Sequence, residues 1–189
     1  VVIKSVSAAH HAGLLAHAIP HARIVLILRN PLAQVASRIN GIKTGQFEMK
    51  GIDFDRRLLA LPQAKAYNID EQALSAMSLA ERLAWEWAIS NERAIDELAG
   101  NPRSFVLRYV DLANDPLSVS RKLFDFAGLP WAHETEAFIA KSTTREGRGY
   151  YTVLKDGRGN NESWRTILSE QEITAIANIM RASKCGSVT

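Results

Sequence analysis

Nearly continuous apolar runs along the chain predict its strands. The first covers residues 23–28 and reads Arg-Ile-Val-Leu-Ile-Leu, and the second covers residues 104–109. Because apolar residues do not alternate with polar ones here, both runs are typical of strands buried on two faces, as in a parallel sheet. A shorter run, residues 1–3, predicts another buried strand that ends at Lys4.

Apolar positions three and four residues apart predict helices around these strands. The clearest helix covers residues 78–98 and opens with Ser78-Leu-Ala-Glu81, a capping-box pattern. Other helices are predicted over residues 8–18, with Ser7 as the cap, and over residues 31–41, 115–128 and 169–180. We interpret residues 41–76 as an irregular excursion over the surface and residues 141–163 as a polar, Gly-rich loop. Strands alternating with helices predict an α/β fold with a mostly parallel sheet.

Polar residues follow the predicted strands at the place where parallel sheets bind ligands, beyond the carboxyl ends of the strands. The three polar segments are residues 4–5, 29–30 and 109–111. Lys4 and Arg29 lead two of these segments, so this edge is predicted to bind an anion. Ser37 lies about two helical turns beyond Arg29, and a forked guanidinium together with a hydroxyl can flank one phosphate.

Composition narrows the classes of protein that this sequence can encode. The 189 residues, 47% of them hydrophobic, suit one globular domain over residues 1–189. The net charge of +3 is spread along the chain without a block of Lys and Arg, which permits an anionic ligand and argues against nucleic acid as a partner. The single cysteine, Cys185, excludes an internal disulfide. His17 and His21 have a metal-binding spacing, but Pro20 interrupts their helix and no third ligand is evident, so no metal site is predicted.

Four short motifs follow one another near the start of the chain. They are Lys4-Ser5 at the end of one predicted strand, Ile19-Pro20 before the next, Arg29-Asn30-Pro31 after it, and Ser37 eight residues beyond the arginine. This order and spacing resemble the 3′-phosphate-binding segment of sulfotransferases that use 3′-phosphoadenylyl sulfate (PAPS). By this resemblance, Arg29 and Ser37 hold the 3′-phosphate of PAPS.

Residues 108–112 read Arg-Tyr-Val-Asp-Leu and are similar to the Tyr-Glu-Asp-Leu segment of the same family. The resemblance implies that Tyr109 lies near the adenine of the nucleotide. Val110 stands where the family usually has Glu, so any role of that Glu is absent here.

A third match is the segment Gly157-Arg158-Gly159 ahead of Trp164, which looks like the Gly-rich basic loop of the family. Glycine lets the backbone approach a ligand closely. By resemblance, Arg158 and Gly159 would therefore meet the 3′-phosphate from its other side.

The resemblance implies a P-loop NTPase-like sulfotransferase fold and an enzyme that transfers a sulfuryl group from PAPS, leaving adenosine 3′,5′-bisphosphate. The acceptor would be a hydroxyl or an amine of a carbohydrate, a lipid-like alcohol or a peptide, with residues 41–76 as its lid or wall. Lys4 is placed to stabilise the charge that develops at the sulfuryl group. His10 or His11 could be the base that takes the proton of the acceptor, and the base could equally lie upstream of Val1.

Two alternatives from other classes stay open. One is a catalytically inactive homologue that serves as a binding module. The other is a P-loop nucleotide kinase, which normally needs a metal-binding Asp at the end of a strand, and none of the predicted strands ends in one.

The Gly-rich loop that cradles the 5′-phosphosulfate in this family has no counterpart before Lys4. We therefore expect an N-terminally truncated sulfotransferase domain that is poorly stable and inactive by itself. No export signal or membrane segment is visible, so the cytoplasm is the default compartment, although an anchor upstream of Val1 would place the protein in the Golgi. The sequence does not predict the oligomeric state.

Overall fold

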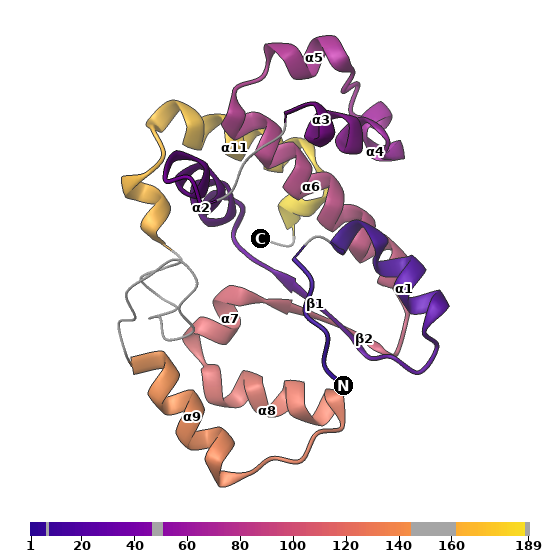
Figure 1. Ribbon diagram of the computed structural model, residues 1–189, viewed down its shortest axis with the longest axis vertical. Helices are drawn as coiled ribbons and strands as arrows, with labels where there is room; N and C mark the ends of the chain where they lie inside the picture. Colours follow the sequence, from indigo (N-terminus) through magenta and orange to yellow (C-terminus); the bar gives the residue numbers. More distant parts are fainter. Residues whose placement is uncertain (7, 47–50, 145–161, 188–189) are drawn as a thin grey trace.

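The computed structural model describes residues 1–6, 8–46, 51–144 and 162–187 (Figure 1). In chain order its elements are η1 (Ala9–His11), α1 (Ala12–Ala18), β1 (Ile24–Leu28), α2 (Pro31–Lys43), α3 (Gly51–Leu59), α4 (Pro62–Ala66), α5 (Glu71–Ala76), α6 (Leu79–Leu98), β2 (Ser104–Arg108), α7 (Tyr109–Asn114), α8 (Pro116–Ala127), α9 (His133–Thr144), η2 (Ser163–Thr166), α11 (Glu170–Ala182) and η3 (Lys184–Ser187). The elements named η are short 3₁₀ helices.

A parallel pair of strands lies in the middle of the molecule, between a helical layer that contains α6 and the helices α7 to α9 (Figure 1). The register runs from Ile24 opposite Ser104 to Leu28 opposite Arg108. One face of β1 packs through Leu26 and Leu28 against α1 and α6. The prediction of an α/β fold with parallel strands is therefore confirmed.

The expectation that both strands are buried on both faces is wrong. Ile27 is 54% exposed and Val106 is 43% exposed. Ile27 lies beside the buried Leu107, on the face away from α1 and α6. There the ring of Phe126 from α8 packs against Phe105, with centroids 5.3 Å apart, so α8 covers β2 rather than β1.

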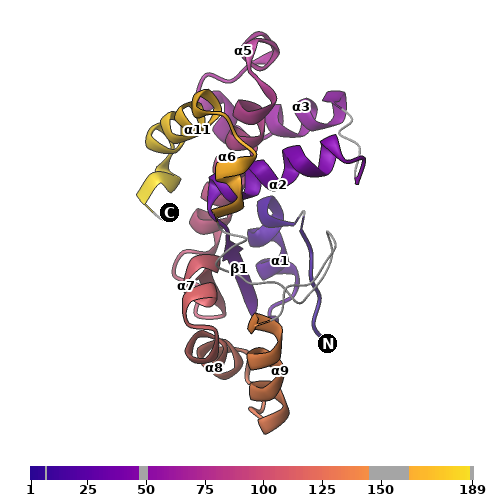
Figure 2. The ribbon, with the colours of Figure 1, turned by 90° about the vertical axis from the view of Figure 1, so that its left-hand side faces the viewer.

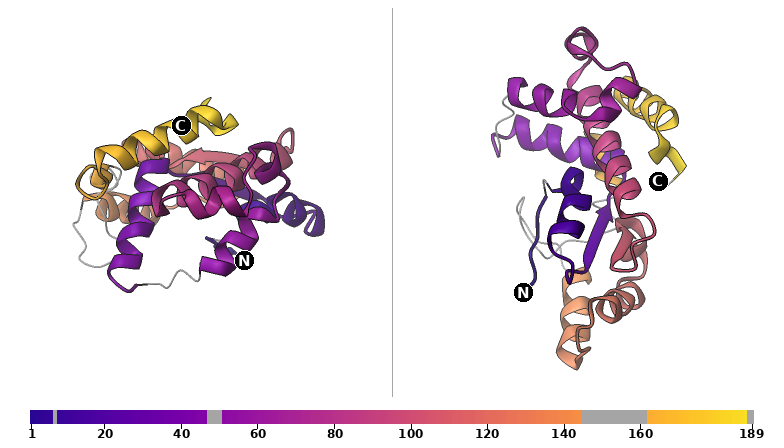
Figure 3. Two further views of the ribbon diagram at one scale, coloured as in Figure 1. Left: turned by 90° about the horizontal axis from the view of Figure 1, so that it is seen from above. Right: turned by 90° about the vertical axis from the view of Figure 1, so that its right-hand side faces the viewer.

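The strand predicted over residues 1–3 is also wrong. Residues 1–5 adopt no regular structure, and Val1, Val2 and Ile3 are each at least 82% exposed. The segment runs along the outside of the molecule, apart from the two strands (Figures 2 and 3). An apolar run becomes a strand only where a neighbour accepts its backbone hydrogen bonds. Among the described residues, β1 and β2 pair with each other and not with this segment.

The larger hydrophobic core forms where α6 packs against α2 and α11. Its largest fully buried side chains are Val35, Leu58, Leu74, Leu83, Ile89, Ile176 and Cys185. The capping box predicted for α6 is confirmed, because Ser78 Oγ accepts from the Glu81 amide and the Glu81 carboxylate accepts from the Ser78 amide. The cap fixes where this long central helix begins.

Residues 41–76 were expected to be an irregular surface excursion, and for their described part this is wrong. The short helices α3, α4 and α5 pack beside α6 (Figure 3, left). They bury Leu58, Ala64 and Leu74 to an exposure of 2% or less. Helices of five to nine residues are too short to show a clear apolar period, which explains why the sequence pattern missed them.

The remaining differences concern the ends of elements. The predicted strand over residues 104–109 ends at Arg108, and Tyr109 begins α7 instead. The predicted helix over residues 8–18 is divided into η1 and α1, and its expected cap, Ser7, lies outside the described residues. Within the described part of the chain, no helix combines the length and the apolar character needed to cross a membrane.

Candidate functional site

Arg29 and Tyr109 meet at the carboxyl edge of the sheet. Leu28 and Arg108 are paired at the ends of β1 and β2, so the next residue of each strand emerges at the same edge. The guanidinium carbon of Arg29 lies 5.9 Å from the centre of the Tyr109 ring, a cation–π distance. The predicted proximity of these two polar segments is therefore observed.

The start of α2 lies at the same edge, directly after Arg29. Asn30 caps the helix, since its Oδ1 accepts a hydrogen bond of 3.3 Å from the Ala33 amide, and Pro31 occupies the first turn. The N-terminus of a helix carries partial positive charge. Arg29 and the N-terminus of α2 therefore both contribute positive potential at the carboxyl edge of the sheet. Ser37 is half-buried about two turns along α2, so the helix fixes its position relative to Arg29.

Arg108 and Asp111 form a forked ion pair at the start of α7. Arg108 Nε donates to Asp111 Oδ2 and Arg108 Nη2 donates to Asp111 Oδ1, both at 2.8 Å. The hydrogen bonds from Arg108 lower the pKa of the Asp111 carboxyl. The pair joins the last residue of β2 to α7 and so orients the turn that carries Tyr109. Its spacing of three residues was visible in the sequence, although its role was missed.

Arg158 and Gly159, the predicted basic loop, lie outside the described residues. The chain that follows them is described: η2 packs against α2, and Trp164 packs against the larger core. Arg165 stacks on Trp164, with its guanidinium carbon 4.4 Å from the ring centre. The segment after the predicted loop therefore lies against the helix that carries Ser37.

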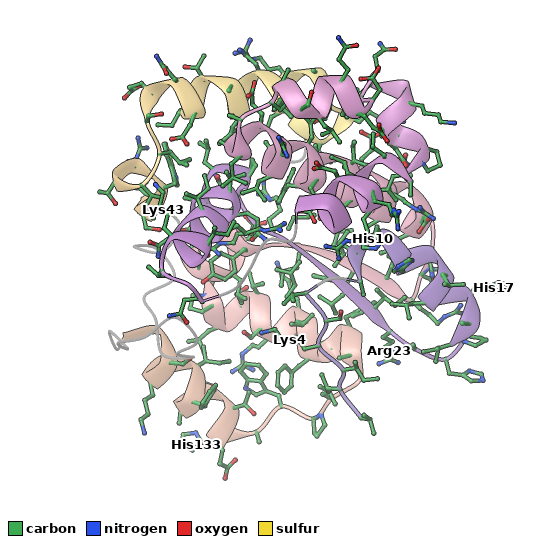
Figure 4. All side chains as sticks on the ribbon, turned by 45° about the horizontal axis from the view of Figure 1, so that its top comes forward. Lys4, His10, His17, Arg23, Lys43 and His133 are labelled. Carbon is green, nitrogen blue, oxygen red and sulfur yellow. The ribbon has the colours of Figure 1, made fainter. Side chains whose placement is uncertain are left out.

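Lys4 was expected at the end of a strand beside Arg29. It is instead exposed on the irregular N-terminal segment (Figure 4). The placement that the strand would have given Lys4 is wrong, because the strand itself is not formed among the described residues.

His10 lies on η1, at the opposite end of α1 from the turn that leads into β1, and therefore toward the carboxyl end of that strand (Figures 1 and 4). Its ring centre is 4.2 Å from that of His11. Burial lowers the pKa of His10, and the neighbouring charges of His11, Arg93 and Arg57 lower it further. A lowered pKa keeps the imidazole neutral near pH 7, the form that can accept a proton.

Sequence reasoning missed the contacts that hold the His10 segment on α6. Glu97 Oε2 accepts a hydrogen bond of 2.8 Å from the Gly13 amide, and Glu97 Oε1 accepts one of 2.7 Å from Arg93 Nε. The spacing of four residues between Arg93 and Glu97 is a signal that the sequence carries. The contact with Gly13 joins residues 84 positions apart and has no local signal.

The described residues contain no cluster of three or more His, Cys, Asp or Glu side chains arranged to hold a metal ion. The site is instead built from an arginine, an aromatic ring and a helix N-terminus at the carboxyl edge of a parallel sheet. These features define an α/β protein whose sheet edge has the positive groups that suit an anion.

Comparison with known proteins identifies the family within that class. A model described as the sulfotransferase family matches residues 1–133, and the chain belongs to this family. The matched stretch includes Arg29, Ser37 and Tyr109 and ends before Arg158.

The relatives found are carbohydrate sulfotransferases. Carbohydrate sulfotransferase 3 of Mus musculus is 30% identical over 145 residues, which cover 76% of this chain and 28% of that protein. The Homo sapiens protein of the same name is 35% identical over 65 residues, 33% of this chain and 14% of that protein. Carbohydrate sulfotransferase 2 of Mus musculus is 32% identical over 74 residues, 38% of this chain and 14% of that protein. The chain thus spans at most 28% of these relatives, and no solved structure matches it.

Proposed function

We propose that the protein is a sulfotransferase that moves a sulfuryl group from PAPS to a hydroxyl or amine acceptor. The observation that carries this proposal is the pairing of Arg29 with Tyr109 at the carboxyl edge of the sheet, inside the stretch that matches the sulfotransferase family. Family membership supports a sulfate donor, and the choice of PAPS rests on how well these residues suit a nucleotide phosphate.

The residues at this edge fit a nucleotide that carries a phosphate. The guanidinium of Arg29 offers forked donors that match phosphate oxygens, and the N-terminus of α2 adds a positive dipole. The hydroxyl of Ser37 is a further donor on the same helix. The Tyr109 ring offers an aromatic face for a base, and Arg158 and Gly159 would complete the phosphate site.

When bound, PAPS would supply a sulfuryl group activated by its link to a phosphate. The acceptor must lose a proton as it attacks the sulfur. Neutral His10 takes that proton on an imidazole nitrogen, and its lowered pKa keeps it in the required form near pH 7. Lys4 offsets the negative charge that develops at the sulfuryl group, which requires the exposed N-terminal segment to reach the edge of the sheet.

A carbohydrate is the proposed acceptor. All of the relatives described above are carbohydrate sulfotransferases. Arg57 of α3 lies near enough to His10 to lower its pKa, so α3, the first of the helices of residues 51–76, borders the proposed base. We propose that these helices form a wall for the sugar, in place of the surface excursion that the sequence indicated. A lipid-like alcohol or a peptide is the alternative acceptor, and the transfer assay described below includes both.

The first test is calorimetric binding of adenosine 3′,5′-bisphosphate to the intact protein. We expect Arg29→Ala to weaken binding about 10- to 100-fold, the effect of losing hydrogen bonds to a charged group. Arg181→Ala is the matched control, because Arg181 lies on α11 and hydrogen-bonds Asn178. Absence of binding in a folded protein would overturn the PAPS proposal and favour an inactive relative.

A second test separates the enzyme from an inactive binding module. Sulfuryl transfer from labelled PAPS to a panel of carbohydrates, alcohols and peptides is measured with the intact protein. Transfer to a carbohydrate supports the full proposal. Binding of the bisphosphate without transfer to any acceptor would favour the module, and phosphoryl transfer from ATP would favour the kinase alternative.

A further inference from the structure

The segment that carries His10 is fastened to α6 by a three-residue contact, which we call the Glu97 clasp and define as Gly13, Arg93 and Glu97. Glu97 accepts one hydrogen bond from the Gly13 amide at 2.8 Å and another from Arg93 Nε at 2.7 Å. The first N–H groups of a helix have no partner inside it, and Gly13 is the second residue of α1. Glu97 supplies that missing partner from another helix.

The close approach of the clasp requires glycine. A Cβ added at position 13 would lie 2.7 Å from Glu97 Oε2 and 2.8 Å from Glu97 Cβ. Atoms cannot approach so closely without displacement of the Glu97 side chain or of α1. The absence of a side chain at Gly13 therefore lets α6 reach the backbone directly after η1.

The position of Glu97 in α6 also indicates that its charge is stabilised from outside its own helix. It lies in the last turn of α6, where the helix dipole disfavours a negative charge. Burial raises the pKa of Glu97, but the hydrogen bonds from Arg93 and Gly13 lower it overall, so the carboxylate stays ionised. The charge is thus held by Arg93 and by the start of α1 rather than by the end of α6.

Charged groups from two helices surround His10 beside the clasp. His11 lies next to it on η1, Arg93 and Glu97 lie on α6, and Arg57 lies on α3. The two arginines disfavour a proton on His10, whereas Glu97 favours one and offsets the charge of Arg93. Glu97 therefore acts on His10 in two ways, through the fixed backbone and through its charge.

We propose that Glu97 is a positioning residue for the sulfuryl transfer reaction. It fixes η1 on α6 through Gly13 and offsets the charge of Arg93, and so holds His10 in place and preserves the basicity that it needs to accept a proton. This inference rests on the proposed function, because it assigns a purpose to the clasp only if His10 takes the proton of the acceptor.

Three variants test the inference. Glu97→Gln keeps the shape and an acceptor for Gly13 but removes the charge, while Gly13→Ala keeps every charge and displaces the contact. His10→Asn removes the proposed base. Arg181→Ala again serves as the control, since it removes a charge from another helix.

The first readout is the titration of the His10 imidazole, followed by NMR in the 189-residue chain. We expect Glu97→Gln to lower the pKa of His10, because the arginines then act without their counter-charge. The second readout is kcat against pH in the intact protein. The acidic limb of that profile reports deprotonation of the base, so Glu97→Gln should move it to lower pH.

We expect kcat to fall about 100-fold in Gly13→Ala and by at least about that factor in His10→Asn, with unchanged affinity for adenosine 3′,5′-bisphosphate. Full activity in His10→Asn would overturn the role of His10 as the base, and the inference with it, but not the transfer from PAPS. A Glu97→Gln variant whose pH profile and His10 titration match the wild type would overturn the inference alone. A wild-type protein that neither binds the bisphosphate nor transfers a sulfuryl group would overturn the proposed function and the inference with it. In that event the NMR titration would still measure the electrostatic effect of Glu97 on His10.

Discussion

The hydroxyl of Tyr67 donates a hydrogen bond of 2.6 Å to the carboxylate of Glu92, which is only 5% exposed. The same hydroxyl accepts a bond of 3.3 Å from the Lys184 amide. Glu92 therefore keeps a partner although it is buried within α6, and the residue after α4 is joined to η3. The Lys184 ammonium, 3.8 Å from Glu92, is 71% exposed at its side chain and adds little to this contact.

We expect Tyr67→Phe to destabilise the fold by about 1–3 kcal/mol, because the variant leaves a buried carboxylate without its donor. Urea denaturation of the 189-residue chain measures the change. Tyr109→Phe is the control, since the contact between Arg29 and the Tyr109 ring does not require the hydroxyl. Equal stability of Tyr67→Phe and the wild type would show that the hydrogen bond to Glu92 contributes nothing.

The same contact predicts how stability depends on alkaline pH. Burial first, and then the hydrogen bond to Glu92, raise the pKa of Tyr67 to about 12. In the unfolded chain the phenol titrates near its ordinary value of about 10, so the folded state holds the proton more tightly. The stability that this proton confers is complete below about pH 10 and is lost as pH rises through the folded-state pKa. Ultraviolet absorbance during an alkaline titration should show one tyrosine that ionises last, and that signal should be missing in Tyr67→Phe.

Cys185 is predicted to be inert in the folded protein. It is 1% exposed, its Sγ lies 3.5 Å from the Ala88 carbonyl oxygen, and burial raises its pKa to about 12. Reaction with an alkylating reagent requires the thiolate. Modification should therefore be negligible at neutral pH and become complete in denaturant, as followed by mass spectrometry. Rapid modification of the native chain would contradict the buried position of Cys185.

Two neighbouring residues of β1 test the uneven burial of the sheet. Leu28 is 3% exposed and Ile27 is 54% exposed. Leu28→Ala should cost about 2–5 kcal/mol, the usual range for a buried leucine, whereas Ile27→Ala should cost about 1 kcal/mol or less. Equal losses in urea denaturation would mean that another part of the molecule covers Ile27.

Gly128 and Gly45 form a matched pair of left-handed glycines. Gly128 ends α8 with φ of 62°, and a Cβ there would overlap the guanidinium of Arg23. Gly45 has φ of 66°, and a Cβ added there would meet no described atom within 4 Å. Both alanine variants should lose about 1 kcal/mol from backbone strain, and Gly128→Ala should lose more because Arg23 must move. Adding Arg23→Ala should then restore part of that extra loss in a thermal melt, and a double variant no more stable than Gly128→Ala would contradict the contact.

The sequence predicted the features that depend on local pattern. The parallel pairing of β1 and β2 followed from their apolar runs, and the meeting of Arg29 with Tyr109 followed from the common edge of parallel strands. The capping box of α6 was predictable because it too is a local pattern, with Ser78 and Glu81 three residues apart.

Features that depend on distant partners were not predictable. Residues 1–3 have the composition of a strand, but composition does not show whether a neighbouring strand is present to pair with them. Glu97 gives no hint that it binds Gly13, because the contact arises only when α1 packs on α6. The burial of α3 to α5 has the same cause, since it depends on how these short helices meet the core rather than on their own pattern.

The bond between Tyr67 and the Lys184 amide spans 117 residues of sequence, and it has a consequence for synthesis. While the chain grows on the ribosome, α4 and α6 emerge long before η3, so Glu92 and the part of α6 that Cys185 contacts lack their partners from η3 during that time. This contact can therefore form only after η3 has emerged, and until then the surface of α6 that η3 covers is open to chaperones and to other chains.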